Sequence, residues 1–196
     1  MAHQVVRAAL LLLVIVAVEA SAPPPRGVTI GYATYQGTGC NYYNSNLFRS
    51  DDYTTVGFLL DGMVAATSSL AARRANCAIS FSLHDPGGRS VAITKATVSG
   101  FADINHDSRG TYEVKYCFAG QTGTATIERK IEGPYVGSFK YTDDFLTVVS
   151  SECSNAVNVL NVKTVVRVDG PKALMGMDGN DNKFKISLNL RWSRCS

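Results

Sequence analysis

The chain has 196 residues, of which 45% are hydrophobic and 18% are charged, and its formal net charge at pH 7 is +3. This length suits one globular domain that can bury a substantial core. The weak positive charge lacks the concentrated basic character of nucleic-acid-binding proteins, so we expect no nucleic-acid partner.

The start of the chain has the pattern of a secretory signal peptide. Arg7 precedes an apolar run over residues 8–18, and small residues follow. This is the usual order of charged region, apolar region and cleavage site. The run is shorter than the ~20 apolar residues that cross a bilayer. We predict cleavage after Ala20, because a cut after Ala22 would place Pro23 at the scissile bond, and we expect a secreted protein with no membrane span left.

The boundaries that follow are residues 1–20 for the signal peptide, 21–27 for a proline-rich lead-in and 28–196 for a single domain. Residues 28–35 predict the first strand, and residues 36–50, rich in Gly, Tyr and Asn, predict a loop. Residues 53–60 alternate in polarity and predict a second strand. The Ala-rich residues 63–75 are the candidate for the only short helix.

Residues 76–83 predict a strand with one buried face. Cys77, Ile79, Phe81 and Leu83 fall on one side of an extended chain, whereas residues 78, 80 and 82 fall on the other. Asp85-Pro86-Gly87-Gly88 ends the strand with strong turn chemistry.

The remaining predicted strands cover residues 91–98, 111–118, 122–131, 135–141, 145–149, 158–168 and 184–192. Turns separate them, at residues 103–110, 132–134, 169–171 and 178–182. Alternation is clearest in 184–192, and in 111–118, where Tyr112 and Tyr116 share the apolar face. Eight to ten short strands, most with one polar face, predict an all-β fold, an antiparallel β-sandwich.

Five cysteines in a secreted chain predict disulfides and leave one thiol over. Cys117 lies on the polar face of its strand, so we predict that it is free. The predicted bridges are Cys40–Cys77 and Cys153–Cys195. A free Cys117 is interpreted as a thiol covered by other structure, with an intermolecular disulfide as the alternative.

Several segments resemble a family of small secreted proteins, common in fungi and also found in bacteria, that is classed as a domain of unknown function. The matching segments are Gly37-Thr38-Gly39-Cys40, Arg74-Ala75-Asn76-Cys77, residues 112–120, Gly133-Pro134 before Asp143-Asp144, and Trp192-Ser193-Arg194-Cys195. The resemblance implies four cysteines at positions 40, 77, 153 and 195, and it implies no known activity. Cys117 departs from the family pattern.

No catalytic motif stands out. The chain has no Gly-x-Ser-x-Gly elbow, and both His84 and His106 read as structural or turn residues. A glycosidase would need two carboxylates that converge in a cleft. Asp51-Asp52 and Asp143-Asp144 are the candidate pairs, and only the fold can bring one residue of each together.

No metal or other cofactor is expected. Residues 103–107 and 178–182 each space Asp and Asn like the start of a calcium loop, but residues 103–107 are not followed by the Gly and Glu that complete one. Asp and Asn also favour turns for backbone reasons, which is the preferred interpretation of both segments.

Two surfaces are candidates for binding. Tyrosine and asparagine gather in residues 32–53, and the candidate ligand-binding residues are Tyr35, Tyr42, Tyr43, Asn44 and Phe48. Four basic residues, Lys163, Arg167, Lys185 and Arg191, would form a positive stripe if their strands were neighbours. The alternative for each is a structural role, in packing the loop or solvating a sheet face.

We therefore expect a secreted, non-catalytic protein of the extracellular space or cell wall that binds carbohydrate or a protein partner. The alternatives are a secreted glycan-active hydrolase and a coat protein that assembles through Cys117. The chain has no Asn-x-Ser/Thr site for N-glycosylation.

Overall fold

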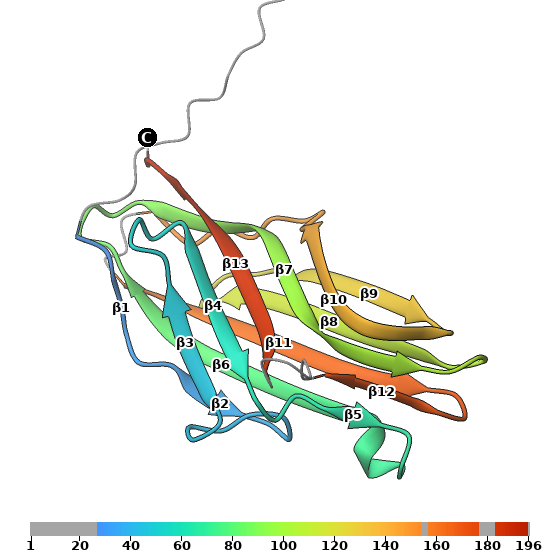
Figure 1. Cartoon of the computed structure of the whole chain (residues 1–196). Helices are drawn as coiled ribbons and strands as arrows, with labels where there is room; N and C mark the ends of the chain where they lie inside the picture. Colours follow the sequence, from blue (N-terminus) through green and yellow to red (C-terminus); the bar gives the residue numbers. More distant parts are fainter. Residues whose placement is uncertain (1–26, 154–156, 177–182, 196) are drawn as a thin grey trace, which may run out of the picture.

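The computed structural model describes residues 27–153, 157–176 and 183–195, and Figure 1 shows their arrangement. The predicted signal peptide, the proline run and the turn at residues 178–182 lie outside these ranges. The described residues form two antiparallel sheets packed as a sandwich, with one 3-10 turn, η1 (Ala71–Arg73). The predicted all-β, antiparallel sandwich is confirmed.

The first sheet has the order β1-β6-β11-β8-β9, with β2 also paired to β6. Its strands are β1 (Thr29–Ile30), β2 (Thr34–Gln36), β6 (Arg74–His84), β8 (Arg109–Phe118), β9 (Ala125–Glu132) and β11 (Val157–Asp169). β6 and β11 are the central pair, and the strand that holds Cys77 is therefore an inner strand of this sheet.

The second sheet has the order β3-β4-β13-β7-β12-β5, with β10 on the opposite edge of β7. Its strands are β3 (Ser45–Arg49), β4 (Thr55–Leu60), β5 (Ala65–Ala66), β7 (Ser90–Ile104), β10 (Tyr135–Asp144), β12 (Ala173–Gly176) and β13 (Phe184–Ser193). The two outermost long strands, β9 of the first sheet and β10 of the second, lie on the same side of the sandwich (Figure 1).

The core lies where the period of two predicts it. Buried side chains alternate with outward ones along the long strands, so the inner faces of both sheets meet in one apolar cluster. The largest buried residues include Tyr112 and Tyr116 of β8 and Phe58 of β4. The Tyr116 hydroxyl is satisfied in the interior, because it donates toward the Ile93 carbonyl at 2.9 Å and accepts from the Val149 amide at 3.0 Å.

Four predicted segments differ at least in part from the structure. Residues 28–35, predicted as one strand, form the two short strands β1 and β2. The predicted loop at residues 36–50 contains β3, which pairs with β4. The polar residues in this segment led to the prediction of a loop. Residues 63–75 hold η1, the one short helix among the described residues, as expected, but they also form β5, which pairs with β12, and the start of β6. Residues 145–149 do not form a strand. The Val149 amide donates a hydrogen bond to the Tyr116 hydroxyl and not to the backbone of a neighbouring strand.

Both predicted disulfides are present. Cys40 joins Cys77 and Cys153 joins Cys195, with Cα–Cα distances of 5.5 and 5.6 Å. Cys117 is free and half-buried on the outer face of the first sheet. The first disulfide links the loop before β3 to the central strand β6, so it ties an edge of the sandwich to its middle.

The turn from β6 to β7 is built around a buried carboxylate. Asp85 accepts hydrogen bonds from the amides of Gly87 and Arg89, at 3.0 and 2.9 Å, and from the Arg89 guanidinium at 2.7 Å. The hydrogen bond from the Arg89 side chain is the main reason that the pKa of Asp85 falls to about 2. The Asp-Pro-Gly-Gly turn predicted from the sequence is therefore also an ion-pair site.

A polar cluster closes the side of the sandwich between β9 and β10. The Arg129 guanidinium pairs with Asp143 and lies 4.6 Å from the centre of the Tyr141 ring. Asp143 also accepts a hydrogen bond of 3.0 Å from the Tyr112 hydroxyl. The bond from Arg129, followed by that from Tyr112, lowers the pKa of Asp143. The opposite side, between edge strands β2 and β3, holds the cleft described next.

Candidate functional site

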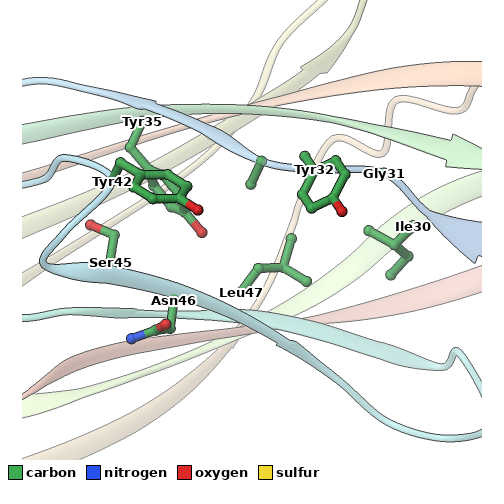
Figure 2. A pocket seen from close by; sticks show the side chains of 9 residues that line it. Ile30, Gly31, Tyr32, Tyr35, Tyr42, Ser45, Asn46 and Leu47 are labelled. Carbon is green, nitrogen blue, oxygen red and sulfur yellow. The ribbon is translucent and has the colours of Figure 1, made fainter.

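A cleft of about 630 Å³ opens between the β1–β2 edge of the first sheet and β3 of the second. Figure 2 shows the tyrosine rings and the β3 side chains on its two sides. The lining residues are Ile30, Gly31, Tyr32, Ala33, Tyr35, Tyr42, Ser45, Asn46 and Leu47. The cleft is therefore bounded by segments from both sheets, at the side of the sandwich that β9 and β10 do not close.

Two of the three tyrosines of the cleft are highly exposed. Tyr32 is 100% exposed and Tyr42 is 76% exposed, whereas Tyr35 is half-buried and packs against the core cluster. Burial raises the pKa of the Tyr35 hydroxyl, so this group stays neutral and able to donate a hydrogen bond at physiological pH. The cleft thus combines one anchored ring with two rings that have most of their surface in water.

The loop that carries Tyr42 is held by a disulfide and by a close approach to β6. Cys40 is bonded to Cys77, and the Gly39 amide donates to the Asn76 carbonyl at 2.9 Å. A Cβ at Gly37 would lie 2.2 Å from the Asn76 carbonyl oxygen, so only glycine allows this approach. The Gly-x-Gly-Cys segment is therefore the part of the sequence that fixes the loop to the sheet.

Two asparagine side chains shape the tip of the loop. The Asn41 side-chain oxygen accepts from the amides of Tyr43 and Asn44, at 2.8 and 3.2 Å. The Asn44 side-chain oxygen accepts from the Asn41 amide at 2.7 Å and from the Ser45 hydroxyl at 3.1 Å. These reciprocal bonds mimic backbone turn bonds and limit the conformations of residues 41–45.

Two of the five predicted ligand residues line the cleft, and the other three do not. Tyr35 and Tyr42 line the cleft, and Tyr43, 95% exposed, packs edge to face on Tyr42 with ring centres 5.8 Å apart. Asn44 holds the turn, as described above. Phe48 lies outside the lining, where its ring contacts the Lys185 ammonium at 4.8 Å on the outer face of the second sheet.

Sequence reasoning did not select Tyr32, Ser45 and Asn46, which also line the cleft. Tyr32 lies in the break between β1 and β2, and the alternation of residues 28–35 suggested one continuous strand. Ser45 and Asn46 begin β3, the strand hidden in the predicted loop. An exposed tyrosine beside Gly31 was the one available signal, because glycine within a strand pattern often marks a break.

The four candidate catalytic carboxylates are each engaged locally. Asp51 pairs with Arg49 at 3.9 Å, Asp52 accepts from its own turn, and Asp144 pairs with Lys95 at 3.4 Å. Asp143 belongs to the cluster with Arg129. Through the strand register, Asp144 is three strands away from β4, a backbone separation of about 14 Å. Each of the four carboxylates is therefore engaged within its own turn or by a neighbouring strand.

The two histidines considered as catalytic candidates and the first calcium-like segment lie in turns or at strand ends. His84 ends β6, and His106 is exposed in the turn that follows β7. Within the described ranges, no group of three or more His, Cys, Asp or Glu side chains is arranged to hold a metal ion. Residues 178–182, the second calcium-like segment, lie outside those ranges.

The predicted basic stripe does not form. Lys163 and Arg167 lie on β11 of the first sheet, whereas Lys185 and Arg191 lie on β13 of the second sheet. The condition for the stripe, that the two strands are neighbours, is therefore not met, because alternation fixes the face on which a side chain lies and does not fix which strand lies beside it. No helix among the described residues is long and apolar enough to cross a membrane.

A family model described as "Domain of unknown function (DUF4360)" matches residues 26–195. The chain belongs to this family. An uncharacterized secreted protein of Arthroderma benhamiae is 28% identical over 185 residues, which cover 90% of this chain and 75% of that protein. This DUF4360 protein is a secreted, extracellular protein, as predicted.

Solved structures resemble this DUF4360 chain only weakly. TmCBM61 in complex with β-1,4-galactotriose has a TM-score of 0.29 and 10% identity, covering 83% of this chain and 88% of that one. A family 11 carbohydrate-binding module from Clostridium thermocellum has a TM-score of 0.24 and 6% identity, over 86% and 88%. Eiger TNF from S. frugiperda has a TM-score of 0.32 and 11% identity, over 86% and 96%. TM-scores this low say nothing about a ligand.

Proposed function

We propose that this DUF4360 protein is a non-catalytic carbohydrate-binding protein that attaches to extracellular or cell-wall polysaccharide through its tyrosine cleft. The observation that supports this function is the arrangement of Tyr32, Tyr35 and Tyr42 around one open cleft at a disulfide-held edge. Large aromatic groups left in water without a structural reason commonly mark a binding site.

The chemistry of the lining suits a sugar. A tyrosine ring offers a flat apolar face on which the C–H face of a pyranose can stack, and its hydroxyl can bond a sugar hydroxyl. Ser45 and Asn46 on the opposite wall add a hydroxyl and an amide. Because the cleft is open along the edge of the sandwich, it can accept a polymer from the side as well as a chain end.

The fixed backbone also favours binding. A flexible loop would lose conformational entropy when a ligand orders it. Here the loop is already held by the disulfide, by the hydrogen bond from the Gly39 amide to the Asn76 carbonyl and by the two asparagine side chains. Much of the ordering cost is thus met in the free protein.

The test is retention of the purified protein on insoluble cellulose, chitin, β-1,3-glucan and xylan, with released reducing sugar measured in the same tubes. We expect retention on at least one polymer without release of sugar. Tyr42→Ala should weaken retention about tenfold, since an aromatic contact contributes about 1 kcal/mol or more. Tyr32→Ala should also weaken it.

Leu146→Ala is the matched control, because Leu146 is 99% exposed and lies outside the cleft. The affinity of Leu146→Ala for the polysaccharide should equal that of the wild type. Loss of retention in this control, or no retention of the wild type on any polymer, would contradict the proposal. Release of sugar would point to the hydrolase alternative.

A further inference from the structure

A second concave surface lies on the outer face of the first sheet. This outer groove, of about 350 Å³, runs over β6, β11 and β8, and its outward-facing lining includes Ala78, Ser80, Lys115, Cys117, Asn161 and Lys163. Strand β2 separates it from the tyrosine cleft, because Thr34 and Gln36 of β2 pair with Ser80 and Ala78.

The outer groove contains two lysines in direct register. Lys163 of β11 is opposite Lys115 of β8, and both line the groove. Directly opposed like charges destabilise a sheet pair. Lys115 is partly compensated by Glu113, whose carboxylate lies 2.8 Å from its ammonium. Lys163 forms no ion pair with any residue in the described parts of the chain.

A second opposed pair of like charges lies on the same face. Arg167 of β11 is opposite Arg74 of β6. Arg167 follows Lys163 by four residues, a distance of about 13 Å along β11. Arg167 has a carboxylate partner in Asp169, at 3.2 Å. Two cationic positions spaced along one strand match a polyanion with repeated charges better than a single small anion.

The surface between the lysines can also bind neutral groups. Ser80 and Asn161 both line the groove, and the Ser80 hydroxyl donates a hydrogen bond of 2.5 Å to the Asn161 side-chain oxygen. The Ala78 methyl group and the lysine methylenes give apolar surface beside them. A hydroxyl, an amide, apolar patches and an ammonium group together suit an acidic sugar unit.

We infer that the outer groove binds the carboxylate groups of an acidic, uronic-acid-containing polysaccharide, with Lys163 and Lys115 as the cationic residues. A lipid surface is a poorer fit, because the polar groups lie in a concavity of the sheet and a planar bilayer surface meets protrusions. This site is separate from the tyrosine cleft, so either one can fail without the other.

The test uses trigalacturonate and its methyl ester, two ligands that share one sugar backbone and differ in charge. Calorimetry on the secreted protein should show that esterification weakens binding about tenfold or more, as expected for charge-assisted hydrogen bonds. Added salt should weaken binding of the acid and leave binding of the ester nearly unchanged.

The double variant Lys115→Gln/Lys163→Gln should lose this preference for the acid. The matched control is Lys95→Gln/Lys140→Gln, which removes the same charge from the outer face of the second sheet and should keep the preference. Tyr42→Ala should also keep it, which separates this test from that of the tyrosine cleft.

Cys117 supplies a second measurement, because its half-buried thiol lines the outer groove. Saturating trigalacturonate should slow alkylation of Cys117 by iodoacetamide severalfold in the wild type and in the control. Equal binding of acid and ester, equal effects of the two double variants, or unprotected Cys117 would refute the inference. Lysine-dependent binding to vesicles of acidic phospholipid without trigalacturonate binding would assign the groove to a membrane surface.

Discussion

Removing one disulfide at a time separates loop rigidity from global stability. The two disulfides close loops of similar length, with sequence separations of 37 and 42 residues. Loop-closure entropy predicts that each stabilises the protein by about 4 kcal/mol. Cys40→Ala/Cys77→Ala and Cys153→Ala/Cys195→Ala should therefore lose similar free energies of unfolding in urea.

Their effects on the tyrosine loop should differ. Only the Cys40–Cys77 bridge joins the loop that carries Tyr42 to β6. In Cys40→Ala/Cys77→Ala we expect faster amide hydrogen exchange at residues 41–45 under conditions where the β6 amides remain protected. Retention of Cys40→Ala/Cys77→Ala on polysaccharide should also fall. In Cys153→Ala/Cys195→Ala, amide hydrogen exchange at residues 41–45 should stay near normal.

The result that would refute this reasoning is a single transition. If the loop and the sheet lost protection together in Cys40→Ala/Cys77→Ala, the loop would be part of the global cooperative unit. Equal exchange at residues 41–45 in both variants would show that the bridge does not hold the loop. Both outcomes can be read without knowing the ligand.

Three further predictions concern the polar groups of the fold. Asp85→Asn should lower the free energy of unfolding at pH 7 by about 2 kcal/mol, measured by urea titration. The folded pKa of Asp85, about 2, lies below its unfolded value, so this stabilisation should be present above about pH 4 and lost as the pH falls toward 2. The control Asp51→Asn, at an exposed carboxylate, should change the free energy of unfolding little. Asp143→Asn should lower the free energy of unfolding by about 2 kcal/mol and speed amide hydrogen exchange in β9, because Arg129 loses its carboxylate partner. Unchanged exchange in β9 would show that the Arg129–Asp143 pair does not hold β9 to β10. Tyr116→Phe should cost about 1–3 kcal/mol in thermal unfolding, since the Val149 amide loses its acceptor, and an unchanged melting temperature would disprove that role.

Alternation predicted the interior of the long strands well. Cys77, Ile79, Phe81 and Leu83 are buried on β6, as their spacing indicated. The same holds for the apolar face of β8. A long strand in a two-sheet sandwich has one dry and one wet face, so the period of two is visible in its sequence.

Short strands were harder to predict. β3 is five residues long and begins with Ser45 and Asn46, so its composition resembled a loop. Residues 145–149 had strand-like composition, but they follow a path set by the buried Tyr116 hydroxyl. In both segments the deciding contact is to a residue distant in sequence, which local patterns do not contain.

The candidate site shows the same division. Tyr35 and Tyr42 were selected because tyrosine and asparagine gather in their segment. The roles of Asn44 and Phe48 depended on which partner each side chain found. Lys163 lies opposite Lys115 and is not beside Lys185, because β11 and β13 lie in different sheets.

The sequence by itself determined the fold class, the buried faces of the long strands and which cysteine stays free, because these follow from side-chain periodicity and from the chemistry of a secreted chain. The tertiary structure alone decided which strands lie side by side, and so created the cleft between β2 and β3 and the lysine pair of the outer groove. Strand neighbours are chosen by packing and hydrogen bonding between segments far apart in the chain, and no local pattern records that choice.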